Sequence, residues 1–156
     1  MTVGKEFVSW QNPGLGWSLK YKTDSPNLVA LCSTLIKRFG GTNVGIFMKR
    51  PIKGGTAPST HSFGAALDWK YPSRQTVLQT VLPWLIDNSQ ELGVQAIHDY
   101  LASRIWRPTH PGDGWQKQPK DQFGMGQKWG TWLHIETTPS QWSNSSPVEN
   151  RGINLP

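Results

Sequence analysis

Two short segments of this sequence carry side chains that bind metal ions in proteins. Residues 59–68 read STHSFGAALD and have the form Ser-x-His-x-x-Gly-x-Ala-x-Asp, which contains His61 and Asp68. Residues 133–136 read LHIE and contain His134 and Glu136. Zinc binds neutral imidazole and carboxylate groups, and a catalytic zinc site uses three protein ligands and leaves a fourth position open. Two His and one Asp fulfil that requirement.

The other histidines limit the choice of a third ligand. The chain has four His residues, of which His98 and His110 are the alternatives to His134. His98 adjoins a predicted turn and His110 lies among Pro and Gly, so His134 on a predicted strand is favoured. A bound zinc ion would lower the pKa of a water molecule to about 7 and polarise a carbonyl group, which permits amide hydrolysis without a nucleophilic side chain. Ser59 and Ser62 are expected to be hydrogen-bonding loop residues, because no base accompanies them.

The ten-residue segment resembles the first metal-binding motif of a known family. That family contains the zinc D-alanyl-D-alanine carboxypeptidases and L-alanyl-D-glutamate endopeptidases, and it shares its fold with the hedgehog signalling domain. Its third ligand is a His on a late strand, set between apolar residues and followed by an acid, as in residues 133–136. The resemblance implies one Zn²⁺ ion bound by His61, Asp68 and His134.

The proton acceptor expected in this family is not obvious here. Many members have an acid three residues before the last His, where this chain has Thr131, and others have a His two residues before it, where this chain has Trp132. Glu136 is the predicted catalytic substitute, because residues two apart on a strand face the same side as each other and therefore as His134. An acid at this position could equally orient a ligand His. Three acids in the preceding segments remain open as alternatives: Asp99, Asp113 and Asp121.

The family also places an Arg upstream of the first motif, where its planar donor group would bind a substrate carboxylate or a developing oxyanion. Arg50 is the residue that fits this position, and Lys49 and Lys53 are its rivals. The resemblance therefore implies Arg50 as a second catalytic residue, whereas a solvated strand edge is the simpler explanation of all three cations.

Hydrophobic spacing predicts an α+β fold, a small antiparallel sheet with two main helices, and the resemblance implies that this fold is hedgehog/DD-peptidase-like. Ser25-Pro26 and the Gly pair at 40–41 delimit a helix over 26–39. Ser73 begins a second helix that extends to about residue 92 and bends near Pro83. The predicted strands are 43–52, a hairpin of 94–97 with 103–106, and 131–137; residues 108–130 form a long loop and 138–142 a helical turn.

The bulk composition bounds the remaining possibilities. A chain of 156 residues suits one domain, predicted as an irregular lead-in over 1–24, a zinc peptidase-like domain over 25–142 and a polar tail over 143–156 that is disordered or binds a partner. The single Cys32 excludes an internal disulfide. The net charge of +6 is scattered, so nucleic acid is not an expected partner. No apolar run approaches the roughly 20 residues of a membrane span.

The resemblance implies a zinc metallopeptidase that hydrolyses an amide bond in the peptide stem of bacterial peptidoglycan. We expect a bacteriophage protein, either an endolysin or a component of the virion tail that contacts other tail proteins. No secretory signal is recognised at the N-terminus, so we expect synthesis in the host cytoplasm and action at the cell wall or within the virion. The alternative is a structural or wall-binding virion protein of the same fold that binds zinc but is catalytically impaired.

Overall fold

A six-stranded antiparallel sheet forms the centre of the molecule. The computed structural model describes residues 6–11, 21–52, 55–118 and 131–156. The sheet has the strand order β1-β2-β6-β3-β4-β5, and every neighbouring pair is antiparallel. Its strands are β1 (Thr42–Gly45), β2 (Ala66–Lys70), β3 (Val94–Asp99), β4 (Arg104–Trp106), β5 (Trp115–Lys117) and β6 (Trp132–Thr137). The α+β class and the antiparallel sheet are therefore confirmed.

The first helix, α1, spans Pro26–Phe39, as the sequence predicts. The Ser25 side chain accepts a hydrogen bond from the Leu28 amide, and Pro26 occupies the first turn, where its missing N–H is not needed. Gly40 ends the helix with a φ of 79°. Leu28, Leu31 and Leu35 are fully buried against the sheet.

The second helical segment consists of consecutive short helices: α2 (Arg74–Thr76), a π-helical turn (Val77–Val81), α3 (Leu82–Asp87) and, after Asn88, α4 (Ser89–Leu92). Ser73 caps it and Gly93 ends it with a φ of 65°, as predicted. Close to Pro83, where the sequence predicts a bend, the segment has a π turn in which the Leu82 amide donates to the Val77 carbonyl. Pro83 has no amide hydrogen, which explains why regular hydrogen bonding fails here.

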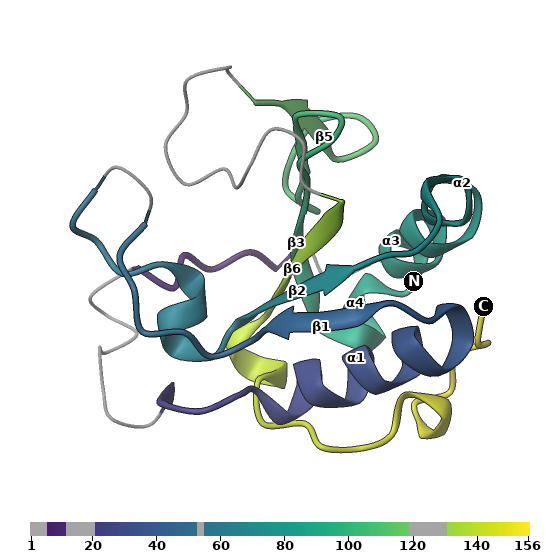
Figure 1. Cartoon of the computed structure of the whole chain (residues 1–156), viewed down its shortest axis with the longest axis horizontal. Helices are drawn as coiled ribbons and strands as arrows, with labels where there is room; N and C mark the ends of the chain where they lie inside the picture. The colour runs from purple at the N-terminus through teal and green to yellow at the C-terminus, as the bar shows by residue number, and fades with distance from the viewer. Residues whose placement is uncertain (1–5, 12–20, 53–54, 119–130) are drawn as a thin grey trace.

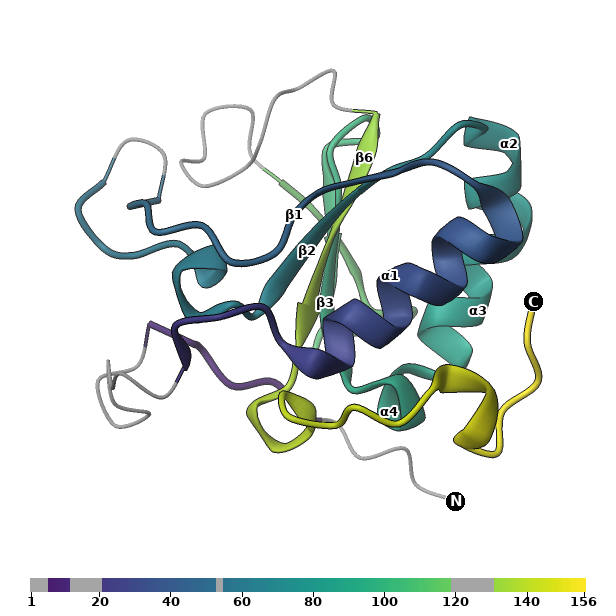
Figure 2. The ribbon, with the colours of Figure 1, turned by 60° about the horizontal axis from the view of Figure 1, so that its bottom comes forward.

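Helices α1 and α3 lie on the same face of the sheet (Figures 1 and 2). Alternate residues of the central strands point toward them: Leu67 and Trp69 on β2, and Leu133 and Ile135 on β6, all fully buried. The residues between them, Asp68 and the two polar residues of β6, must face the opposite side. The apolar core therefore lies between the helices and the sheet, and the polar residues of β2 and β6 lie on the other face of the sheet.

The strand predicted over 43–52 is wrong in length, because β1 ends at Gly45. β1 is an edge strand that, among the described strands, pairs with β2 alone, and its register shifts between Asn43 and Gly45. Val44 is half exposed, although the sequence pattern favours its burial. The chain then leaves the sheet, and the Met48 amide donates to the carbonyl of His61 instead of to a neighbouring strand.

The predicted hairpin is confirmed, since β3 pairs with β4 and Ile97 lies opposite Trp106. β3 is longer than predicted, however, and includes His98, which the sequence pattern places beside a turn. The predicted loop over 108–130 contains the short strand β5, and its residues 119–130 lie outside the described part of the chain. The predicted strand 131–137 and helical turn 138–142 correspond to β6 and to the 3₁₀ turn Pro139–Gln141.

Residues 143–156 are not disordered, contrary to one of the two predictions for this tail, since they pack onto the domain; the other, that the tail binds a partner, stays a prediction. Val148 is fully buried in the main core, and Ile153 and Leu155 pack against that core. Trp84 Nε1 also donates to the Asn154 carbonyl at 2.8 Å. These few apolar residues explain why a segment of mostly polar composition is ordered. Among the described residues, no helix is long and apolar enough to cross a membrane.

Candidate metal centre

Three polar residues from neighbouring strands form a row on the face of the sheet opposite the helices. Asp68 on β2 lies directly opposite His134 on β6, and His134 lies directly opposite His98 on β3. Adjacent strands are about 4.8 Å apart, so the three side chains are held side by side by backbone pairing alone. All three are buried. The predicted pair Asp68 and His134, separated by 66 positions, is thereby brought together.

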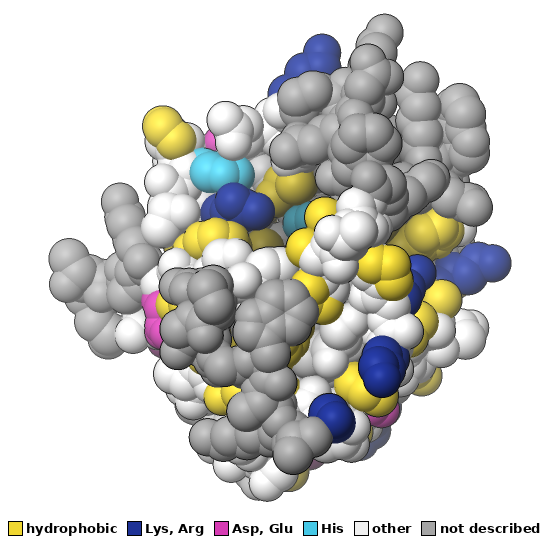
Figure 3. Space-filling model, turned by 90° about the vertical axis from the view of Figure 1, so that its left-hand side faces the viewer, with side chains coloured by type: hydrophobic (Ala, Val, Ile, Leu, Met, Phe, Trp, Pro, Cys, Tyr) yellow, Lys and Arg dark blue, Asp and Glu magenta, His cyan; other side chains and the backbone are white. Residues whose placement is uncertain are grey.

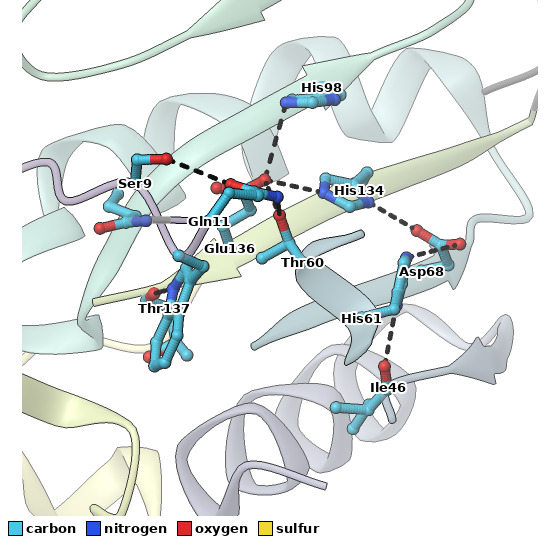
Figure 4. Close-up of polar contacts among 12 residues, drawn as sticks. Ser9, Gln11, Ile46, Thr60, His61, Asp68, His98, His134, Glu136 and Thr137 are labelled. Atoms are coloured by element: carbon cyan, nitrogen blue, oxygen red, sulfur yellow. Dashed lines mark hydrogen bonds and ion pairs between the residues drawn. The ribbon is translucent and has the colours of Figure 1, made fainter. Parts of the chain in front are cut away.

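His61 reaches the row from a short 3₁₀ helix, Thr60–Phe63. Its Nδ1 lies 2.8 Å from the carbonyl oxygen of Ile46, which can only accept, so Nδ1 carries the proton. The Nε2 lone pair consequently faces the carboxylate of Asp68, with 3.3 Å between Nε2 and Oδ2 (Figure 4). The 3₁₀ helix is anchored by Phe63, which packs with the buried Trp10.

Gly64 sets the direction of the chain between His61 and Asp68. It adopts a φ of 63°, and a Cβ at this position would lie 1.7 Å from the carbonyl oxygen of Thr23. No side chain fits there without a shift of the backbone.

We therefore expect Gly64→Ala to lower the free energy of unfolding by more than the roughly 1–2 kcal/mol of left-handed backbone strain alone. Gly112→Ala is the matched control, because Gly112 has a φ of 69° and nothing lies within 4 Å of its Cβ position. Urea unfolding of both variants measures the difference. Equal losses would contradict the steric role of Gly64.

The His134 ring lies between two carboxylates. Its Nδ1 is 3.1 Å from Asp68 Oδ1, and its Nε2 is 3.1 Å from Glu136 Oε1. A carboxylate can only accept, so both hydrogen bonds form when both ring nitrogens are protonated. Burial disfavours the charged ring, but the two carboxylates outweigh it and raise the pKa of His134 to about 9.

The pKa values of the two carboxylates shift downward, opposite to the shift of His134. Burial opposes the charged form of Asp68, yet the hydrogen bond and the positive charge of His134 hold the pKa of Asp68 well below its usual range. Burial likewise opposes ionisation of Glu136, and the His134 contact lowers the pKa of Glu136 to about 2. Thr60 Oγ1 adds a hydrogen bond to Glu136 Oε1 at 3.0 Å. The cluster thus concentrates negative charge beside imidazole nitrogens.

His61, Asp68 and His134 together fit a metal ion. The buried Nε2 of His61 has no hydrogen-bond partner among the described residues, and its lone pair faces a carboxylate oxygen, an arrangement that a cation between them would stabilise. Tetrahedral zinc with bonds of about 2.1 Å separates its ligand atoms by about 3.4 Å. His61 Nε2 lies 3.3 Å from Asp68 Oδ2 and His134 Nδ1 lies 3.1 Å from Asp68 Oδ1, so each nitrogen is close to that distance from one carboxylate oxygen. These three side chains could hold a metal ion, and so could His98, His134 and Glu136.

The remaining predicted residues lie elsewhere. Arg50 is exposed, and its backbone is bonded to Ser62, whose Oγ donates to the Arg50 carbonyl at 2.7 Å. Asp99 is held by the guanidinium groups of Arg74 and Arg104, so both of its carboxylate oxygens are already paired. The other rivals are Lys49 and Asp113, which are exposed, His110, whose Nδ1 bonds to the Gly114 carbonyl, and Asp121 and Lys53, which lie outside the described residues.

Two residues of the site were missed by sequence reasoning. Thr60 lies inside the ten-residue motif and hydrogen-bonds to Glu136, and Gln11 Nε2 lies 3.3 Å from Thr60 Oγ1 (Figure 4). Thr60 could have been found from its place beside His61, whereas nothing in the sequence links Gln11 to a motif 49 positions away. On the face shown in Figure 3, His side chains are visible, one of them set back in a hollow among hydrophobic groups.

Comparison with known proteins gives one family. Residues 22–124 match the family described as the VldE C-terminal domain, which is more than half of the chain, so the chain belongs to this family. The matched segment includes His61, Asp68 and His98 and ends before β6, which carries His134 and Glu136. No curated protein and no solved structure matches the chain.

Proposed function

We propose that this member of the VldE C-terminal domain family is a zinc metallopeptidase that hydrolyses an amide bond in the peptide stem of bacterial peptidoglycan. The observation that carries the proposal is the meeting of His61 Nε2, the Asp68 carboxylate and His134 Nδ1 within 3.3 Å of their neighbours. This donor set is the one implied by the resemblance of residues 59–68 and 133–136 to the zinc carboxypeptidases and endopeptidases of the cell wall.

The residues around the donor set prepare it for zinc. Ile46 holds His61 with Nε2 unprotonated, and Glu136 accepts from Nε2–H of His134, which leaves Nδ1 of His134 for the ion once its proton departs. When bound, zinc would polarise the scissile carbonyl and lower the pKa of a water molecule to about 7. Asp68 supplies the negative charge that favours a divalent ion, and it remains ionised at neutral pH.

In this arrangement Glu136 orients the His134 ring through its hydrogen bond with Nε2. The predicted role of Glu136 as the catalytic base is a separate proposal. We expect Glu136→Gln to weaken zinc binding roughly 10- to 100-fold, because a neutral amide is a poorer partner for the ligand His. Competition with a chromophoric chelator measures the affinity. An unchanged affinity would contradict the orienting role.

The same variant tests the proposed catalytic role of Glu136. A turnover rate that stays about 10²- to 10⁴-fold low at saturating zinc would assign proton transfer to Glu136 as well. Thr60→Val is the matched control, since it removes the hydroxyl that bonds to Glu136 and to Gln11 but leaves the Glu136 carboxylate in place.

The alternative proposal is a wall-binding or structural virion protein that keeps the zinc site and is catalytically impaired. It is favoured by the lack of a free acid to act as a base. Thr131 stands where many members of the zinc peptidase family carry an acid. Asp99 is paired with two Arg side chains, and Glu136 is engaged with His134 and Thr60. In this case the exposed cations, Arg50 among them, would contact anionic wall polymers or tail proteins.

Incubation of the purified protein with zinc and peptidoglycan separates the two proposals. The peptidase releases new amino groups, and His61→Ala abolishes the release while His110→Ala does not. Binding to the wall without release would support the alternative and reject the peptidase. Solubilisation of whole sacculi, with analysis of the fragments, would identify the amide bond.

We also propose that the α+β fold is of the hedgehog/DD-peptidase type. The order of helix, His/Asp motif, second helix, hairpin and final His-bearing strand supports a hedgehog/DD-peptidase-like arrangement, with the site on the sheet face opposite the helices. An origin as a phage endolysin or virion tail component, made in the host cytoplasm, rests on the resemblance alone. Detection of the chain in purified virions would test it.

A further inference from the structure

His98 is a buried histidine that the proposed zinc site does not use. Its side chain lies beside His134, with 4.4 Å between the ring centroids and 33° between the ring planes. Neither ring nitrogen of His98 has a hydrogen-bond partner among the described residues, and the residue is 9% exposed. Ring packing against His134 and Tyr100 explains the position of the ring but satisfies neither nitrogen.

The unpartnered imidazole faces a carboxylate, just as His61 does. His98 Nε2 is 4.0 Å from Glu136 Oε1, and the same oxygen is 3.1 Å from His134 Nε2. One donor atom from each of these three residues lies within 4.8 Å of the other two. Ligand atoms around one zinc ion are expected to lie about 3.4 Å apart, so closure around an ion requires side-chain shifts of roughly 1 Å.

We propose that His98, His134 and Glu136 form a second divalent-metal site, so that the chain binds two ions and His134 presents one ring nitrogen to each. Nδ1 of His134 lies 3.1 Å from Asp68, which belongs to the set with His61, and Nε2 lies 3.1 Å from Glu136, which belongs to the set with His98. When only the first site is filled, Nε2 of His134 keeps its proton and donates a hydrogen bond to Glu136. The second ion displaces this proton, which leaves to solvent. The second ion therefore binds more weakly than the first.

This second site goes beyond the proposed peptidase and does not require hydrolysis. An ion bridged through one imidazole is farther from the first ion than the roughly 3.5–4 Å of two-metal hydrolytic sites. Its effect is to clamp β3 to β6 through His98 and His134, with Glu136 held by the ion in place of its hydrogen bond from His134 Nε2–H. The donors are neutral imidazole and carboxylate, a set suited to Zn²⁺ and other first-row divalent ions.

Zinc stoichiometry is the direct test. The full chain is titrated with Zn²⁺ by calorimetry, and bound zinc is counted by elemental analysis after gel filtration in buffer of fixed free zinc. We expect two ions per chain in two phases, and one ion per chain in His98→Phe, which keeps a ring against His134 and removes both nitrogens. His110→Ala, the control His outside the cluster, retains two.

The variants separate failure of this inference from failure of the proposed function. His61→Ala is expected to retain one ion through the second set, whereas His98→Phe retains one through the first. One ion in both the wild type and His98→Phe, with none in His61→Ala, overturns the second site and leaves the first intact. No ion in wild type overturns both. His98→Asn, with circular dichroism of each variant, guards against loss of fold as the cause.

Discussion

Replacing His134 with Ala is expected to remove zinc binding and to lower any zinc-dependent hydrolysis by about 10³-fold or more, since the ion supplies several kcal/mol of transition-state stabilisation. His134 is the residue shared by both donor sets, so no other single substitution removes a ligand from each. The effect is measured by zinc titration and by release of amino groups from peptidoglycan.

The same substitution should destabilise the protein even without metal. His134 is the proton carrier between Asp68 and Glu136, and both carboxylates are buried. Removing one partner of a buried ion pair costs about 3–5 kcal/mol, because an uncompensated charge is left in a low-dielectric site. His110→Ala is the control, since its ring contacts a carbonyl in a turn. Full zinc binding by His134→Ala would exclude the proposed ligand set.

The parts of the fold that the sequence predicts well are those set by local chemistry. Ser25, Pro26 and Gly40 determine both ends of α1 within a few residues of the helix itself. Ser73 and Gly93 delimit the second helical segment for the same reason. The ten-residue motif is likewise local, which is why the sequence alone suffices to pair His61 with Asp68.

What could not be predicted depends on pairing between distant segments. The residues around His98 are typical of a turn, yet β3 continues through His98 because β6 pairs with it as far as Asp99. The pattern over residues 46–52 predicts a strand, although β1 lies at the edge and the chain there bonds to the segment around His61. Val148 has no sequence signal of burial, because its contacts come from α1 and the core.

The prediction for Arg50 rests on weaker grounds. Arg50 is assigned the role of the family's upstream Arg only because it precedes the first motif in the sequence. Its side chain is exposed in the structure, and its backbone contacts the motif through Ser62. The direction of an exposed side chain is not determined by its place before a motif, so Arg50 remains a prediction. Kinetics of Arg50→Ala on a stem peptide would decide it.

Zinc affinity should rise by about tenfold for each pH unit between about pH 6 and pH 8, because binding at the first site displaces one proton from Nδ1 of His134. In the metal-free protein the pKa of His134 is raised to about 9, so this proton is present throughout that range. Asp68 adds no second proton, because its pKa lies well below the usual range. The slope of log affinity against pH should therefore be close to one.

The stability of the metal-free protein should change with pH in the opposite direction to the zinc affinity. A pKa raised on folding gives stability that is full below the unfolded value of about 6.5 and is lost as pH rises through about 9. The metal-free chain should thus melt at a lower temperature at about pH 9 than at about pH 6.5, while excess zinc increasingly stabilises it as pH rises. Calorimetric titrations at three pH values, with buffer-dependent heats to count released protons, measure the slope. A slope near zero would mean that the ion does not compete with the His134 proton, and the ligand assignment would then fail at its central residue.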